Sequence, residues 1–240
     1  MGILIVGANG ATGVNLVKQI LKNGRQVKVI VRPSSKIPNT WNKNNQVSVI
    51  RRNINEISLE EMIEYVKDCH AVASCLGHNL SFKGIYGKPR KLVTEAVNLI
   101  CDAVIKNAPE VLVKFVLMNT AGNQNRDLNE PITFKEKMII GAIRLLLPPH
   151  TDNEEAADYL RKKVGKKNSS IRWVVIRPDS IINLEKVTEY TVHNSPTRSA
   201  IFNPGKTSRI NVGDFMAKLI VSKNEWNKWE GEMPVIYNME

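Results

Sequence analysis

The 240-residue chain has few cysteines and no long apolar run, and both shortages exclude classes of protein. No stretch of about 18 apolar residues occurs, so we expect no membrane-spanning helix and no membrane partner. Met1-Gly2 runs directly into an apolar segment without a basic leader, so we expect no signal peptide. The cysteines form no Cys-x-x-Cys motif, and we interpret them as reduced core thiols of a cytoplasmic protein: Cys69, Cys75 and Cys101.

Several catalytic and ligand-binding motifs are missing as well. Histidines, cysteines and carboxylates do not cluster at metal-ligand spacing, so we expect no metal site. There is no Gly-x-Ser-x-Gly elbow, and Gly205-Lys206-Thr207 lacks the spacing of a phosphate loop. The net charge is +11, but basic residues do not alternate with aromatic ones, so we expect no nucleic-acid partner. We interpret the basic segment 161–167 as a solvated helix end, with Gly165 as the stop.

A glycine-rich turn is the most informative feature that the chain does have. It follows the apolar run Ile3-Leu4-Ile5-Val6 and precedes an amphipathic stretch over 14–21, which gives the order strand, turn, helix. Glycines allow a sharp turn close to a pyrophosphate, and the helix N-terminus offers unpaired N–H groups. The motif therefore predicts a dinucleotide site formed by Gly7, Asn9, Gly10, Ala11, Thr12 and Gly13.

Apolar strands alternate with helical stretches along the rest of the chain. This pattern predicts a doubly wound parallel sheet, the Rossmann type of α/β fold. We predict strands over 2–6, 26–31, 47–50, 71–76, 111–118, 171–176 and 234–237. We predict helices over 13–23, 89–106, 154–164 and 211–221, a short helix after Ser58, and a loop over 36–46. Residues 1–240 then form a single NAD(P)-binding domain, in which the aperiodic segment 179–210 is a small irregular substrate lobe.

The segment after the second predicted strand bears on the choice of cofactor. NAD sites usually carry a carboxylate about 20 residues beyond the glycines. This chain has Arg32 there instead, followed by Pro33-Ser34-Ser35-Lys36. A guanidinium can hold a 2′-phosphate through two hydrogen bonds, and Ser34 can donate another. We therefore predict NADP(H) rather than NAD(H); the alternative is that Arg32 is a surface residue beside a simple turn.

These motifs together resemble an atypical short-chain dehydrogenase/reductase of the NmrA-like, NAD(P)-binding kind. They are the glycine motif, Arg32, Asn119-Thr120-Ala121-Gly122, Arg177-Pro178 and the segment 207–212. The resemblance covers nearly the whole chain and implies an NAD(P)-binding Rossmann domain. It also implies further cofactor contacts at Asn53 and Ile54 beside the adenine, Leu76 and Gly77 along the cofactor, Pro178 near the nicotinamide, and Asn119.

One feature of that family is displaced in this chain. Catalytic members carry Tyr-x-x-x-Lys on the helix after the fifth strand, where the lysine lowers the pKa of the tyrosine. Tyr159 and Lys163 have this spacing, but their position differs, so we interpret them as a coincidence. The place of the family tyrosine falls near His150 instead, with Glu154 in the place of the lysine.

His150 is accordingly our candidate for the proton donor, because imidazole titrates near neutral pH. Thr120 would orient a substrate oxygen. A structural alternative accounts for the same segment: Asp152 or Asn153 caps a helix, and the two glutamates after it favour the positive helix end. His78, which follows the fourth predicted strand, either contacts the ligand or caps its own loop, whereas we expect His70 at a helix end.

The predicted function is an NADPH-dependent reductase that acts on a small carbonyl, quinone or flavin-like acceptor. Tyr190, His193 and Arg198 of the lobe are the candidates for contacts with the substrate. Two alternatives stay open: a non-catalytic sensor that binds NADP(H), and an assembly protein that uses the basic surface. Trp226 and Trp229 either pack against the last strand or form a contact patch. The sequence leaves the substrate and the oligomeric state open.

Overall fold

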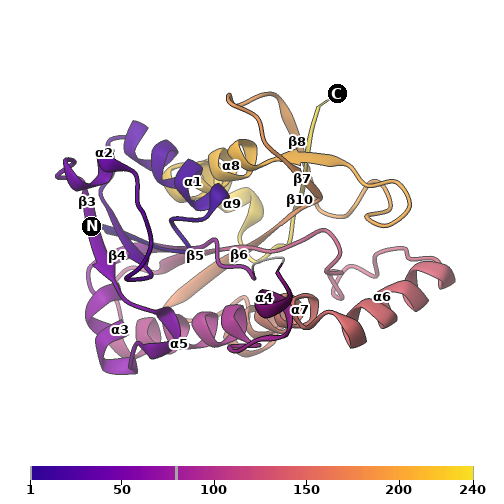
Figure 1. The fold of residues 1–240 in the computed structure, drawn as a ribbon, viewed down its shortest axis with the longest axis horizontal. Coiled ribbons are helices and arrows are strands. Elements are labelled where there is room, and N and C mark those ends of the chain that lie inside the picture. Colours follow the sequence, from indigo (N-terminus) through magenta and orange to yellow (C-terminus); the bar gives the residue numbers. More distant parts are fainter. Residues whose placement is uncertain (1, 79–80, 240) are drawn as a thin grey trace.

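The computed structural model describes residues 2–78 and 81–239, which form a twisted sheet with helices on both faces (Figure 1). Within these ranges, eight strands form the main sheet, in the order β3-β2-β1-β4-β5-β6-β10-β8. All neighbouring pairs are parallel except β10 and β8. The Rossmann-type fold is therefore confirmed. The strands are β1 (Gly2–Val6), β2 (Val27–Val31), β3 (Val47–Arg51), β4 (Cys69–Ser74), β5 (Val113–Met118), β6 (Ile171–Pro178), β8 (Tyr190–His193) and β10 (Val235–Asn238).

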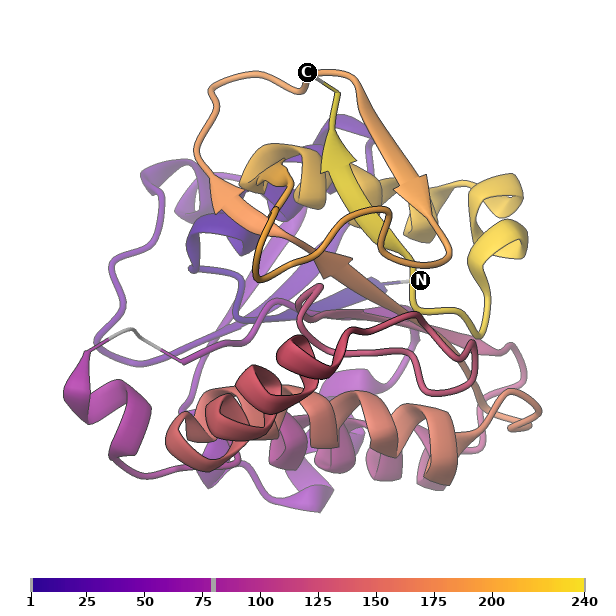
Figure 2. The ribbon, with the colours of Figure 1, turned by 90° about the vertical axis from the view of Figure 1, so that its right-hand side faces the viewer.

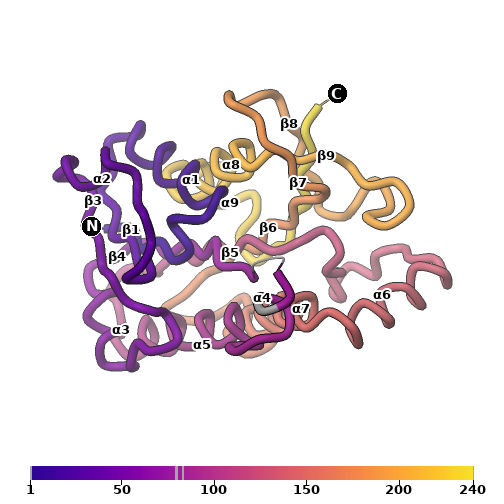
Figure 3. Tube along the Cα trace, viewed as in Figure 1, coloured from indigo at the N-terminus to yellow at the C-terminus, as the bar shows by residue number. Residues whose placement is uncertain are grey.

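Helices cover the sheet in two layers, which the chain trace separates clearly (Figures 1 and 3). One layer contains α1 (Ala11–Lys22), α8 (Arg209–Val221) and α9 (Lys223–Trp229). The other contains α3 (Leu59–Val66), α5 (Leu92–Asn107) and α7 (Pro148–Asp158), which continues as a π-helical segment over Tyr159–Val164. Alternate residues of each strand face opposite helix layers. Ile3 packs in the core under α1 and α8, and Leu4 packs in the core under α3 and α5. Central strands with two buried faces must be apolar throughout.

Several helical segments differ from the predictions. Phe134–Leu146 forms α6, which its sequence pattern concealed because apolar side chains lie on both its inner and its outer side. α7 begins at Pro148 rather than at 154, since proline is well suited to the first turn of a helix. Asn39–Asn42, within the predicted loop 36–46, forms one turn, α2, because Trp41 is buried there. A further short helix, α4, spans Phe82–Tyr86.

The segment 179–210 contains more regular structure than predicted. It includes β8 and a small parallel pair, β7 (Ser180–Ile182) with β9 (Lys206–Ser208). The strand predicted at 234–237 is confirmed as β10, and β8 extends the sheet beside it. The pairs β7–β9 and β8–β10 each join segments that are distant in the sequence, so no local sequence pattern predicts the pairing. Both tryptophans of α9, Trp226 and Trp229, are buried in the core and are therefore packing residues.

The structure tests the predictions for His70 and for the three cysteines. β4 begins at Cys69, so His70 lies in a strand and not at a helix end, and the prediction for it was wrong. All three cysteines are free and buried, as core thiols should be. Burial raises the pKa of Cys75 to about 12, and it raises the pKa of Cys101 in the same way. No helix in the described ranges is long and apolar enough to cross a membrane.

Arg177, near the end of β6, joins the sheet to three loops. Its Nε donates to the carbonyl of Met233 at 2.6 Å. Its two terminal nitrogens donate to the carboxylate of Glu130 and to the carbonyls of Asn123 and Asn194. The guanidinium is fully buried, so these hydrogen bonds replace those that water would make. Arg177 therefore fixes the loops that surround the carboxyl ends of β5 and β6.

Candidate functional site

The glycine-rich turn after β1 is shaped by positions that leave no room for a side chain. Gly7 has φ +70°, and a Cβ there would lie 2.5 Å from the carbonyl carbon of Cys75. A Cβ at Gly13 would lie 2.3 Å from the carbonyl oxygen of Gly7. Gly10 closes the turn, since its N–H donates to that same oxygen at 3.0 Å. Only glycine fits both crowded positions, which explains the spacing of the motif.

The N-terminus of α1 is open toward this turn. Gly10 is the N-cap residue and offers no side chain to the first N–H groups of the helix, and the first turn carries no acidic residue. The N–H groups of Ala11, Thr12 and Gly13 therefore have no capping side chain in the described chain. Such a helix end, with its positive dipole, binds phosphate groups.

A cavity of about 360 Å³ lies over the carboxyl ends of β1 and β2, beside the turn. It brings together eight of the predicted cofactor residues: Gly7, Asn9, Gly10, Arg32, Asn53, Ile54, Leu76 and Gly77. Ser35 lines it in place of the predicted Ser34. Residues that the predictions missed also line it, namely Arg52, Asn55, Pro89 and Leu92. Arg52 directly follows β3, and the rule that ligands bind at strand ends could have identified it.

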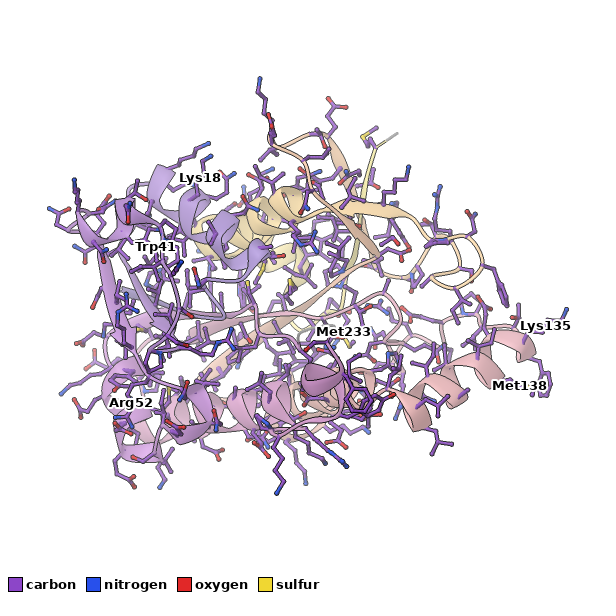
Figure 4. All side chains as sticks on the ribbon, in the orientation of Figure 1. Lys18, Trp41, Arg52, Lys135, Met138 and Met233 are labelled. Carbon is purple, nitrogen blue, oxygen red and sulfur yellow. The ribbon has the colours of Figure 1, made fainter. Side chains whose placement is uncertain are left out.

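Arg32 stands on a tight turn at the edge of this cavity. The N–H of Ser35 donates to the carbonyl of Arg32 at 2.9 Å, and Arg51 holds the turn by donating to the carbonyls of Pro33 and Ser35. The Arg32 side chain is exposed and forms no ion pair within the described ranges. Arg52, labelled in Figure 4, is engaged instead, because it donates to Glu61 of α3 at 3.0 Å. Arg32 is therefore the cation of this pair that is open to a ligand.

A second cavity, of about 270 Å³, lies at the carboxyl ends of β5 and β6. It contains both predicted catalytic residues, and its walls come from α6, α7 and the lobe: Thr120, Gly122, Ile140, Ile143, His150, Asp179, Ser180, Ala200 and Ile201. The hydroxyl of Thr120 accepts a hydrogen bond from the N–H of Gly122. A Cβ at Gly122 would lie 3.4 Å from Cε1 of His150 and 3.7 Å from the Thr120 hydroxyl. The bare backbone of Gly122 therefore leaves a small space that both side chains face.

His150 is backed by a buried carboxylate. Its Nε2 lies 3.5 Å from Oε1 of Glu154, an ion-pair distance that is long for a hydrogen bond. Arg144 of α6 holds this carboxylate with two hydrogen bonds of 2.7 Å each. Burial alone would raise the pKa of Glu154, but the His150 ring and the Arg144 guanidinium outweigh it and lower the pKa to about 2. Arg144 was missed because it lies on α6, a helix that was not predicted.

Asn119 and Pro178, both predicted cofactor contacts, line neither of these cavities. Asn119 donates to the carbonyl of Asn153, and its side-chain oxygen accepts from the N–H of Thr120. It therefore fixes Thr120 relative to α7. Pro178 ends β6, and its carbonyl accepts from the N–H of Ala121. Both residues are adjacent to the second cavity through these hydrogen bonds.

The N-cap residue of α7 is Leu147, so the capping interpretation of this segment was wrong for Asn153 and for Asp152. Asp152 lies inside α7, and its carboxylate accepts from the N–H groups of Val93 and Thr94 at the start of α5. The same carboxylate lies 2.7 Å from Nε2 of His78. His78 Nδ1 contacts the carbonyl of Gly84, so this histidine is engaged on both sides. Its role is to hold its loop, one of the two readings of the sequence.

The remaining candidates lie elsewhere. Tyr159 donates to Asp102 of α5, so it is directed away from both cavities, and burial raises its pKa. Tyr190 donates to Asp214 of α8. Arg198 lies over the ring of Tyr237 and lines a separate cavity of about 570 Å³ with Lys206. Tyr190, His193 and Arg198 are all absent from the lining of the second cavity.

Solved structures with this fold are numerous. An oxidoreductase from Lactococcus lactis is similar over 100% of this chain and 92% of its own, with a TM-score of 0.70 and 17% identity. A short-chain dehydrogenase/reductase from Veillonella parvula, solved with NADP, covers 99% of this chain and 94% of its own, with a TM-score of 0.70 and 14% identity. A candidate NADH-flavin reductase from Streptococcus pneumoniae covers 100% of both chains, with a TM-score of 0.66 and 18% identity. At such identities the likeness shows the fold.

A search of curated proteins found no match. The model of a family described as NAD(P)H-binding, in contrast, matches residues 7–223, from the first glycine of the turn to the start of α9. This range includes every residue predicted to touch the cofactor and the whole lining of the second cavity. The chain therefore belongs to the NAD(P)H-binding family.

Proposed function

We propose that this protein is an NADPH-dependent reductase whose acceptor is a small carbonyl, quinone or flavin-like compound. The observation that carries the proposal is the pair of cavities along one edge of the sheet, one beside the glycine turn and one holding Thr120 and His150. Ligands of doubly wound sheets bind at this edge. An NADP complex among similar structures, and a candidate NADH-flavin reductase among them, agree with the proposal.

The first cavity suits the adenosine half of the cofactor. The open N–H groups of α1 would bind the pyrophosphate, and the glycines allow it to approach the backbone. Asn53 and Ile54 would lie along the adenine. Arg32 would bind the 2′-phosphate that distinguishes NADPH from NADH, and no carboxylate stands there to bind a free ribose hydroxyl.

The second cavity suits the reaction itself. NADPH, when bound, would supply the hydride that reduces the acceptor. Thr120 orients the carbonyl oxygen in the space beside Gly122, and His150 gives that oxygen a proton. Arg144 holds the Glu154 carboxylate with two hydrogen bonds, and this carboxylate lies behind the His150 ring.

The experiment is a calorimetric titration with NADPH, NADP and NADH, followed by NADPH oxidation with a panel of quinones, flavins and aldehydes. We expect binding that prefers NADPH, and turnover that His150→Ala strongly lowers without loss of binding. His193→Ala is the matched control, because this histidine lies on β8 outside the second cavity. Normal turnover by His150→Ala would remove the proton-donor role.

One observation favours a second function, a redox sensor that binds NADP(H) without turnover. Tyr159 is engaged with Asp102, so the usual tyrosine and lysine do not meet in either cavity. A sensor needs no proton donor. Tight NADPH binding without turnover on the whole panel would support this function over the reductase.

A further inference from the structure

The outward side of α6 carries a stripe of exposed apolar side chains. Phe134, Met138 and Leu145 are 75%, 62% and 82% exposed. Their spacing places them on one side of the helix, with Gly141 between them. Figure 4 shows Met138 projecting away from the body of the protein. Exposed apolar patches of this kind mark contact surfaces, and neither cavity accounts for this one.

The same helix borders the second cavity with its inner side. Ile140 and Ile143 line that cavity, and so do Ala200 and Ile201 of the lobe. The hydroxyl of Ser199 donates to the carboxylate of Glu136, which holds this part of the lobe beside the start of α6. The next lobe residue, Phe202, is 57% exposed. Figure 2 looks onto this face, where α6 lies in front with the lobe above it. The cavity therefore opens between two segments whose outer side chains are apolar.

Positive charge flanks the stripe. Lys135 and Lys137 are exposed on its two sides, because each lies about 100° around the helix from a stripe residue. The carboxylate of Glu136, between them in the chain, accepts hydrogen bonds from Thr133 and Ser199 and offsets one of the two positive charges. Neither lysine forms an ion pair in the described ranges, and the chain as a whole carries a net charge of +11. The surface is thus apolar at its centre and cationic at its borders.

We propose that α6 and Phe202 dock onto an anionic lipid surface, with the mouth of the second cavity toward the lipid. An apolar helix side with lysines beside it lies in the membrane interface, its apolar side chains among the acyl chains and its cations at the headgroups. A second copy of the chain suits the surface less well, because it would bring the lysines of both copies together. The lack of a spanning run, which led us to expect no membrane partner, bears only on transmembrane helices. The docking does not depend on the reductase activity.

The test is sedimentation of the full chain with vesicles of phosphatidylcholine, alone or mixed with phosphatidylglycerol. We expect binding to the mixed vesicles only, weakened by salt. Replacing Phe134, Met138 and Leu145 together by serine should weaken it by about tenfold or more. Lys135→Glu with Lys137→Glu should do the same, since both lysines lose their attraction to the headgroups. Val111→Ser is the control, because Val111 is 55% exposed and precedes the amino end of β5, whereas α6 follows its carboxyl end.

Three outcomes would overturn the proposal. The first is failure of the unaltered protein to bind the anionic vesicles. The second is vesicle binding that neither the serine nor the glutamate substitutions change. If the triple serine variant does not fold, the single substitution Leu145→Ser takes its place in this comparison. The third is a dimer in light scattering that the serine substitutions dissociate, because the stripe would then be covered by a second copy.

Discussion

The guanidinium of Arg177 and the carboxylate of Glu130 form a buried bidentate ion pair, with nitrogen–oxygen distances of 2.6 and 2.9 Å. Both side chains are buried, so water cannot take the place of either partner. The pair joins β6 to the loop that follows β5, so it supports the wall of the second cavity. Its removal should be felt first in stability.

Arg177→Met leaves the Glu130 carboxylate buried without its cation, so we expect a loss of about 3–5 kcal/mol in the free energy of unfolding. Urea denaturation measures it. Adding Glu130→Gln should recover part of the loss, because the uncompensated charge is then gone. A loss below about 1 kcal/mol would mean that the pair behaves like one at the surface.

Gly122→Ala tests the space between Thr120 and His150. The new methyl group would lie 3.4 Å from His150 and 3.7 Å from the Thr120 hydroxyl, which are ordinary contacts that the fold can accept. It would also fill the space proposed for the substrate oxygen. We expect unchanged thermal stability and unchanged NADPH binding, with turnover reduced at least about tenfold. Gly141→Ala, on the open side of α6, is the control. Equal turnover in both variants would contradict the proposed position of the substrate.

Arg32→Ala tests the choice of cofactor. A guanidinium that holds the 2′-phosphate contributes to NADPH binding but not to NADH binding, so we expect NADPH affinity to fall about tenfold or more and NADH affinity to stay constant. Calorimetry with both nucleotides measures the ratio. Arg25→Ala is the control. It removes an equal charge before the amino end of β2, whereas Arg32 follows the carboxyl end, so it should change neither affinity. Equal losses for NADPH and NADH would show that Arg32 does not read the phosphate.

Glu154 predicts a definite dependence of stability on pH. Its pKa is lowered from 4.5 to about 2 in the folded protein, so the folded state binds a proton less readily than the unfolded chain. The ionised carboxylate therefore contributes stability above about pH 4.5, and this contribution is lost as the pH falls toward 2. Unfolding measured across this range should show a shallower decline for Glu154→Gln. Glu155→Gln, whose partner Lys91 is exposed, should keep the decline of the unaltered protein.

The parts of the fold that local chemistry determines could be predicted from the sequence. The glycine turn needs residues without a Cβ at Gly7 and Gly13, and that need is written in the spacing. Ser58 and Glu61 form the capping box that their spacing predicts. Buried parallel strands are largely apolar runs, and this allowed the positions of most strands along the chain to be predicted. Of the eight cofactor residues that line the first cavity, the residues of the turn and Arg32 follow from such local patterns, whereas the family resemblance implied the other four: Asn53, Ile54, Leu76 and Gly77.

The rest depends on contacts between distant segments. Arg144 reaches Glu154 only because α6 folds back on α7, and nothing near Arg144 in the sequence indicates this. β8 pairs with β10 although residues 194–234 lie between them, so its antiparallel partner has no local signature. Asp152 looked like the cap of the helix that follows it, because a carboxylate serves either helix equally well. Only the packing of α5 against α7 decides between them.

The Asp152 carboxylate connects three segments of the chain. Asp152 binds the start of α5, the loop that bears His78, and the helix that bears His150 two residues before it. The loop that follows Leu76 and Gly77 of the first cavity and the helix that carries His150 of the second are therefore joined by one carboxylate, in addition to the sheet that lies beneath both cavities.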